Sequence, residues 1–147
     1  MARRALVSRR TFPENPTAGR AENAEDGPMV SSVIVVDDDE GFRDLARRIL
    51  VDCGYRPEGG ARSVSDALQQ VKRLTPDFAL VDIGLPDGDG LELTRRLTAP
   101  PWNVRVVLMS ADSEATSQRE ALDAGAVGFV PKSELTCEVL DSLLTPG

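Results

Sequence analysis

The 147-residue sequence contains no histidine and only two cysteines, Cys53 and Cys137. Without histidine, no imidazole can serve as a general base, so any chemistry must use carboxylates, hydroxyls, lysine or a bound metal. The two cysteines do not form a Cys-x-x-Cys pair, so we do not expect a zinc site. We expect both to be reduced thiols in a cytosolic protein, toward opposite ends of the fold and not joined in a disulfide.

Long hydrophobic runs and aromatic residues are also scarce. Aromatic residues make up 4% of the chain, so the core must be built from Val, Leu, Ile and Ala. No apolar run approaches the length that crosses a bilayer. The arginine-rich start, MARRALVSRR, lacks the apolar segment of a secretory signal. These absences predict a cytoplasmic protein that makes no contact with a membrane.

Positive charge is in deficit over most of the chain. The formal net charge is −7, and residues 31–147 carry twelve basic against twenty acidic side chains. An acidic domain without a basic stripe is poorly suited to hold a nucleic-acid backbone. We therefore expect no direct binding to DNA.

The first thirty residues differ in composition from the rest. They have few large apolar side chains, no periodicity, and five turn-forming residues: Pro13, Pro16, Gly19, Gly27 and Pro28. This composition predicts a disordered arm over 1–30 and a folded domain over 31–147.

From residue 31 onward, short apolar runs alternate with amphipathic segments. Expected strands are 33–36, 56–61, 78–82, 104–110 and 128–130, and expected helices are 40–54, 63–74, 91–97, 113–125 and 133–144. A strand–helix unit repeated five times predicts an α/β fold with a five-stranded parallel sheet, helices on both faces and right-handed crossovers. In such sheets the functional site lies beyond the carboxyl ends of the strands.

Polar side chains collect at those strand ends. The first expected strand is followed directly by three aspartates, Asp37, Asp38 and Asp39. The third strand ends at Asp82, the fourth ends at Ser110, and Lys132 follows the fifth. Clustered carboxylates raise one another's pKa unless a cation is present. An all-oxygen, acidic cluster suits a hard divalent ion, and Mg²⁺ before Zn²⁺.

The same residues suit phosphoryl transfer. An aspartate can accept a phosphoryl group as an acyl phosphate. Mg²⁺ and Lys132 would neutralise the phosphoryl oxygens, and the Ser110 hydroxyl would donate to one of them. The repulsion within the aspartate run is then offset, because the run holds a metal ion that Asp82 requires for phosphoryl transfer.

Four stretches together resemble the receiver domain of two-component response regulators: VIVVDDDEGFRDLARRIL, DFALVDIGLPDGDGLEL, VRVVLMSAD and AGAVGFVPKSEL. They cover residues 33 to about 144 in the family's order. The resemblance implies a flavodoxin-like fold with strand order 2-1-3-4-5. It also implies a phosphoprotein that acts in signal transduction or a phosphorelay.

The resemblance assigns a role to each matching position. Asp82 is similar to the phosphorylated aspartate, and Asp38, Asp82 and the Gly84 carbonyl to the direct ligands of Mg²⁺. Asp37 would act mainly through metal-bound water. Ser110 and Phe129 occupy the positions of the hydroxyl and aromatic switch residues. Lys132 would contact the phosphoryl oxygens, whereas Asp39 is given no ligand role.

The sequence departs from many receivers after strand five. Pro131 precedes Lys132 and Ser133 follows it, where proline often follows the lysine, so a cis bond after Lys132 stays open. Similar receivers usually carry a helix-turn-helix domain, and here the sequence ends at Gly147, shortly after the last expected helix. We expect a stand-alone receiver that takes its phosphoryl group from a histidine kinase or phosphotransfer protein. Its output would be contact with another protein.

Two alternatives stay open. One is a small phosphatase of the haloacid-dehalogenase type, whose DxD pattern Asp37 and Asp39 fit superficially, although a cap region and a later acidic pair are missing. The other is a receiver fold that serves as a constitutive docking surface. Under the receiver interpretation, we expect the chain to catalyse only its own phosphorylation and dephosphorylation, and not to be an enzyme in any other sense.

Overall fold

The computed structural model describes residues 30–144. Apart from Val30, the arm predicted over 1–30 lies outside this range, as do residues 145–147. Among the described residues, none of the helices is both long and apolar enough to cross a membrane.

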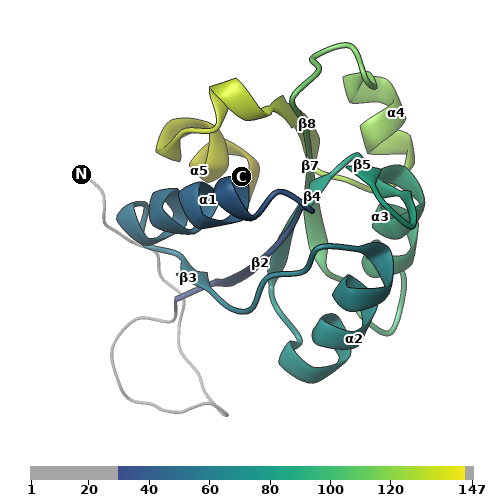
Figure 1. Cartoon of the computed structure of the whole chain (residues 1–147), viewed down its shortest axis with the longest axis horizontal. Helices are drawn as coiled ribbons and strands as arrows, with labels where there is room; N and C mark the ends of the chain where they lie inside the picture. The colour runs from purple at the N-terminus through teal and green to yellow at the C-terminus, as the bar shows by residue number, and fades with distance from the viewer. Residues whose placement is uncertain (1–29, 145–147) are drawn as a thin grey trace. The chain divides into compact units, whose positions relative to one another are not determined.

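The centre of the domain is a five-stranded parallel sheet (Figure 1). Its strands are β2 (Ser32–Val36), β3 (Arg56–Pro57), β4 (Phe78–Asp82), β7 (Arg105–Ser110) and β8 (Gly128–Pro131). They lie in the order β3-β2-β4-β7-β8. Counted along the chain, this is the predicted order 2-1-3-4-5, so the flavodoxin-like fold is confirmed.

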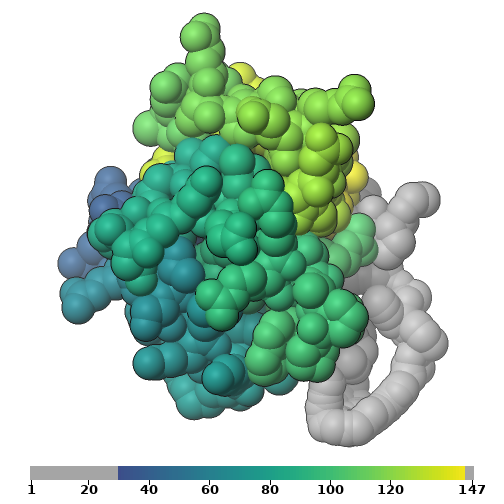
Figure 2. Space-filling view, turned by 90° about the vertical axis from the view of Figure 1, so that its right-hand side faces the viewer, coloured from purple at the N-terminus to yellow at the C-terminus, as the bar shows by residue number. Residues whose placement is uncertain are grey.

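Helices cover both faces of the sheet. Their bounds are α1 (Glu40–Asp52), α2 (Val64–Leu74), α3 (Gly90–Thr98), α4 (Gln118–Asp123) and α5 (Cys137–Leu144). Figure 1 shows α1 and α5 on one side, and α2, α3 and α4 on the other. In Figure 2, the latter three form one continuous face of the domain.

The buried strands explain the two layers. Successive side chains of a strand point to opposite faces, so a strand covered on both sides is apolar throughout. In β2, Val33 and Val35 pack into the cluster beneath α1 and α5. Ile34 and Val36 pack into the cluster beneath α2 and α3. All four side chains are fully buried.

Side-chain caps set the start of the helices, as α1, α2 and α4 illustrate. Asp39 caps α1 by accepting from the Phe42 backbone N–H at 3.3 Å. Ser63 caps α2, because its hydroxyl accepts from the Asp66 backbone N–H at 3.0 Å. Ser117 and Glu120 form a reciprocal capping box on α4. Because Ser117 is the cap, α4 begins at Gln118 rather than at residue 113.

Other boundaries also differ from the sequence prediction. The second strand is only Arg56–Pro57, with an isolated bridge from Ala61 to Val36. Between the strand expected over 78–82 and the helix expected over 91–97, the chain forms a small antiparallel hairpin, β5 (Gly84–Leu85) and β6 (Gly88–Asp89). The bond after Lys132 is trans, since the cis peptide among the described residues is Pro100–Pro101.

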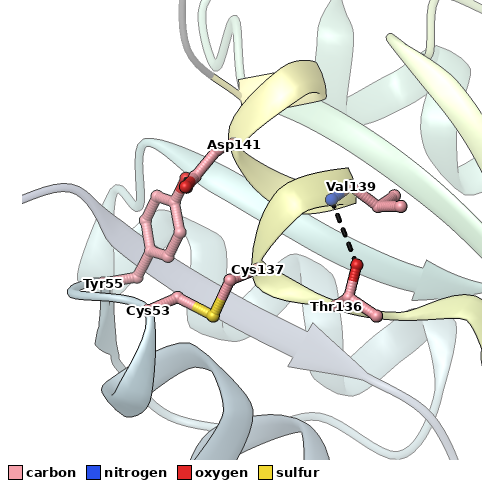
Figure 3. Close-up of a disulfide and its surroundings, with 6 residues drawn as sticks. All are labelled: Cys53, Tyr55, Thr136, Cys137, Val139 and Asp141. Carbon is pink, nitrogen blue, oxygen red and sulfur yellow. Dashed lines mark hydrogen bonds between the residues drawn. A yellow bond between two sulfur atoms is a disulfide. The ribbon is translucent and has the colours of Figure 1, made fainter. Parts of the chain in front are cut away.

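The last helix begins later than expected. Residues Lys132–Glu134 form a short 3₁₀ turn, η2, and Leu135 is extended. The helix α5 then begins at Cys137, and the Thr136 hydroxyl accepts from the Val139 backbone N–H at 3.2 Å (Figure 3).

This late start overturns the prediction for the cysteines. Cys53 and Cys137 form a disulfide with a Cα–Cα distance of 5.4 Å (Figure 3). The prediction assumed that the last helix starts directly after its strand, at the opposite end of the sheet from Cys53. Instead, η2 and Leu135 carry the chain back along α1 before α5 begins, and α1 and α5 share one face of the sheet.

A side chain of α4 binds the outer edge of the sheet. The Gln118 amide donates to the Phe129 carbonyl at 2.6 Å and accepts from the Phe129 N–H at 3.1 Å. Since β8 is the last strand of the sheet, these backbone groups have no neighbouring strand to pair with. Gln118 therefore satisfies both groups and ties α4 to the middle of β8.

Candidate functional site

Three of the predicted carboxylates meet at the carboxyl end of the sheet. Asp37 follows β2, Asp82 ends β4, and the two strands are neighbours with Val36 opposite Val81. One carboxylate oxygen from each of Asp37, Asp38 and Asp82 lies within 4.8 Å of the others. The structure thus brings together the three aspartates that the sequence singled out as metal ligands.

Asp37 is held more rigidly than its neighbours. Its backbone N–H donates to the Ala61 carbonyl at 2.8 Å, and its own carbonyl accepts from the Arg43 guanidinium at 2.6 Å. Its Oδ1 accepts from the Asp39 N–H at 2.9 Å. Its side chain is fully buried, 0% exposed. Asp38, in contrast, is exposed.

Lys132 supplies the positive charge of the site. Its Nζ lies 2.6 Å from Asp37 Oδ2 and 3.7 Å from Asp82 Oδ2. It also lies 4.5 Å from the centroid of the Phe42 ring on α1. With 16% of its side chain exposed, Lys132 is largely withdrawn from water and bound by two carboxylates and an aromatic face.

The environment raises the pKa of Asp82 above its ordinary value. The main cause is burial, followed by the negative charge of Asp37; the charge of Asp38 adds a smaller effect in the same direction. Lys132 and a backbone hydrogen bond with Gly84 act in the opposite direction and lower the pKa. Repulsion between the acids therefore outweighs the single ammonium.

A divalent cation fits this arrangement. Asp37 Oδ2 is buried and accepts no hydrogen bond from any residue in the range 30–144, so it faces Lys132 as an ion pair with lone pairs to spare. Three carboxylates against one ammonium leave a net negative charge that a second cation would neutralise. All the available ligands are oxygens, which Mg²⁺ prefers.

The two residues predicted as switch residues lie on the next two strands of the sheet, β7 and β8. Ser110 ends β7 and is buried, and its hydroxyl accepts from the Asp112 N–H at 3.0 Å. Phe129, on β8 opposite Leu108, is buried and packs in the cluster beneath α2 and α3. The aromatic side chain therefore points inward, and Gln118 fixes the backbone on which it sits.

Glycines frame the Asp82 side of the site. Gly84 lies at the start of β5, exposed, and nothing occupies the space where its Cβ would be. Gly90 is the opposite case, because a Cβ there would collide with the Asp82 carbonyl and with Ile83 Cα. Any side chain at position 90 would push the strand end that carries Asp82.

Sequence reasoning missed three supporting residues. The sequence alone gives no role to Phe42, which faces the Lys132 ammonium, or to Gly90, which lies against the end of β4. It gives none to Asp87 either, whose carboxylate accepts from the Val64 and Ser65 N–H groups at 2.7 and 3.0 Å. These bonds lower the pKa of Asp87 and join the loop after Asp82 to the start of α2. The repeated Asp-Gly pattern of this loop was the only signal in the sequence.

Comparison with known proteins agrees with the geometry. The family model described as "Response regulator receiver domain" matches residues 33–143. The chain is 38% identical over 105 residues to the DNA-binding transcriptional activator DevR/DosR of Mycobacterium tuberculosis, covering 68% of this chain and 46% of that protein. It is 28% identical over 115 residues to the chemotaxis protein CheY of Thermotoga maritima, covering 78% and 96% respectively.

A solved structure shows the same likeness. The signal receiver domain of the response regulator NarL from Mycobacterium tuberculosis superimposes with a TM-score of 0.69 at 30% identity, covering 81% of this chain and all of that one. The chain spans about half the length of the transcriptional regulators it matches. These matches do not favour the phosphatase or the constitutive docking alternative. The fold, the converging strand ends and the matched family model show that the chain belongs to the response regulator receiver family.

Proposed function

We propose that this phospho-accepting signalling domain receives its phosphoryl group on Asp82. The observation that carries the proposal is the position of Lys132, whose ammonium lies between Asp37 and the strand-end carboxylate of Asp82. An ammonium at this position can neutralise the carboxylate before phosphorylation and the phosphoryl oxygens after it. The pKa of Asp82 is raised above its ordinary value, mainly by burial, which makes its carboxylate more basic than that of an ordinary aspartate.

Four groups would hold Mg²⁺ beside Asp82. They are the carboxylates of Asp37, Asp38 and Asp82 and the backbone carbonyl of Gly84, with Asp37 acting mainly through water. When bound, Mg²⁺ offsets the negative charge that builds up on the phosphoryl oxygens. The carboxylate of Asp82 attacks phosphorus, the bond from phosphorus to the donor imidazole nitrogen breaks, and an acyl phosphate forms on the aspartate.

Phosphorylation would then be read out through β7 and β8. The Ser110 hydroxyl would leave the Asp112 N–H and donate to a phosphoryl oxygen. Phe129, which is already buried, would stay packed behind Ser110. Because the Gln118 side chain bonds the Phe129 backbone, a shift of β8 would move α4 as well. The partners that follow are a histidine kinase or phosphotransfer protein on the input side and a further protein on the output side. The acidic domain itself makes no contact with DNA or with a membrane in this proposal, and it acts in the cytoplasm.

This role requires no turnover of a separate substrate. The domain would catalyse its own phosphorylation and dephosphorylation and no other reaction, so we do not class it as an enzyme.

Intact-mass measurement after incubation with acetyl phosphate and Mg²⁺ tests the assignment. We expect one added phosphoryl group that is stable in acid and labile in base. Asp82→Asn should abolish the gain, whereas Asp44→Asn, a matched change on the exposed side of α1, should leave it intact. A phosphoryl gain on Asp82→Asn at the wild-type rate would refute the proposal.

A further inference from the structure

The disulfide lies at one end of a covalent route to the candidate site. Cys53 is the C-cap of α1, the helix whose first turn carries Phe42 and whose N-cap is Asp39. Cys137 is the first residue of α5, five positions after Lys132. The bond thus links the helix that bears the aromatic partner of Lys132 to the segment that bears Lys132 itself.

These links close a ring through the site. The ring runs from Lys132 through η2 to Cys137, across the disulfide to Cys53, back along α1 to Asp37, and returns through the 2.6 Å ion pair. The chain loop that the disulfide closes spans 84 positions and contains Asp82, Ser110 and Lys132. The disulfide is the covalent cross-link in this ring, so its reduction opens the ring.

The disulfide is placed where a reagent can reach it. Both cysteines are partly exposed, and they stand at the outer junction of α1 and α5 rather than inside the core. Beside them, the Tyr55 hydroxyl donates to the Asp141 carboxylate at 2.6 Å, a second and non-covalent link between the end of α1 and α5 (Figure 3). This contact would keep the two elements adjacent after reduction, so the bond could re-form.

We propose that Cys53 and Cys137 form a thiol–disulfide exchange site that accepts electrons from a protein dithiol and adjusts the phosphorylation site. One thiolate of the dithiol attacks a sulfur of the disulfide and forms a mixed disulfide, releasing the other cysteine as a thiol. The second thiolate of the dithiol then attacks the mixed disulfide. The dithiol leaves oxidised to a disulfide, and the receiver gains two electrons and two protons as two cysteine thiols.

Reduction changes how Lys132 is held. In the oxidised form, η2 is tethered between β8 and α1, which limits the positions of the Lys132 side chain relative to Asp82. In the reduced form, the Tyr55–Asp141 hydrogen bond still holds α5 near the end of α1, but η2 loses its covalent tether and Lys132 is restrained only by its ion pairs and by Phe42. This part of the inference rests on the function proposed above. The expected result is slower phosphorylation and a changed Mg²⁺ affinity in the reduced form.

The experiment compares wild type oxidised by trans-4,5-dihydroxy-1,2-dithiane, wild type reduced by dithiothreitol, and the double variant Cys53→Ser/Cys137→Ser. Thiol titration after denaturation should count no free thiols in the oxidised form and two in the reduced form. The melting temperature should fall by roughly 10–20 °C on reduction, as the entropy of an 84-position loop requires. The affinity for Mg²⁺ with beryllofluoride should fall about fivefold or more, the lower end of typical coupling between sites, and the rate with acetyl phosphate should fall as well.

Linkage supplies a readout that does not depend on phosphoryl transfer. If the disulfide favours a binding-competent site, then Mg²⁺ with beryllofluoride must favour the disulfide by the same factor. The ratio of reduced to oxidised dithiothreitol at half-reduction should rise accordingly. The double variant should behave as the reduced form and should not respond to dithiothreitol.

Two results would overturn the inference. One is two free thiols in wild type after treatment with the oxidant, which would mean that the bond does not form. The other is a half-reduction ratio that is unchanged by Mg²⁺ and beryllofluoride, together with equal Mg²⁺ affinity in the two redox forms. Failure of Asp82 phosphorylation alone would count against the proposed function, since the thiol count and the Mg²⁺ affinity would still report on the exchange site.

Discussion

Replacing Lys132 with methionine should destabilise the metal-free domain because it removes the one ammonium that faces two buried carboxylates. Asp37 is fully buried, and only 12% of the Asp82 side chain is exposed. Methionine keeps the length and apolar stem of lysine, so the change in packing is small. Without the ammonium, Asp37 and Asp82 repel each other with little water to screen them.

The distances set the size of the effect. With an effective dielectric constant of about 20, Coulomb's law gives roughly 6 kcal/mol for charges 2.6 Å apart and roughly 4.5 kcal/mol for charges 3.7 Å apart. Much of this attraction offsets the desolvation of the three ions. The net loss for breaking a buried pair is then about 3–5 kcal/mol in the free energy of unfolding.

Urea denaturation at pH 7.5, with and without Mg²⁺, measures this loss. Mg²⁺ at a hundred times its Kd should return about 2.7 kcal/mol to the variant if the cation occupies the acidic cluster. Adding Asp37→Asn to Lys132→Met should recover most of the loss, whereas Lys72→Met, on the exposed side of α2, should have almost no effect. A loss of under about 1 kcal/mol, the range of an exposed pair, would refute the electrostatic account of the site.

Further predictions concern the metal, the pH dependence and the α4 contact. In calorimetry, Asp38→Asn should weaken Mg²⁺ binding more than Asp39→Asn, because Asp39 serves as the α1 cap, a role that asparagine fills equally well, whereas Asp39→Ala should cost about 1 kcal/mol of stability; equal losses of affinity from the two asparagine variants would reject this order. The folded state raises the pKa of Asp82 above 3.8 and so binds its proton more tightly than the unfolded state does. The contribution of Asp82 to the stability of the metal-free domain should therefore decrease as the pH rises through its raised pKa, and Asp82→Asn should remove that decrease in denaturation curves taken between pH 4 and pH 8. Gln118→Ala should cost about 0.5–1.5 kcal/mol and speed hydrogen exchange at the Phe129 amide, because water replaces the lost side chain at this exposed edge, while Gln118→Glu should restore acceptance from the N–H but not donation to the carbonyl; slow exchange in the alanine variant would contradict the role given to this side chain.

The cluster of acids could be predicted because it depends on topology alone. Residues that end neighbouring parallel strands meet at one edge, whatever the loops do. The sequence therefore placed Asp37 and Asp82 together, and Lys132 with them, before any distance was known. The strand order came from the family resemblance, because periodicity identifies strands but not their neighbours.

The disulfide could not be predicted, because it depends on the path of a short segment and not on the topology of the sheet alone. Its geometry depends on the path of five residues after Lys132, where a 3₁₀ turn replaces the first turn of the expected helix. Nothing in the periodicity of 133–144 distinguishes these two paths. The Gln118 contact was equally hidden, because a glutamine at a helix start has no pattern that reveals a partner eleven positions away.

The two edges of the sheet have a consequence for assembly. At one edge, β3 is two residues long and ends at Pro57, which has no N–H to offer. At the other, Gln118 occupies both backbone groups of Phe129, and Pro131 ends the strand. Neither edge presents the row of free donors and acceptors that recruits a further strand. We therefore expect a protein that recognises this domain to bind its side chains rather than to add a strand to the described sheet.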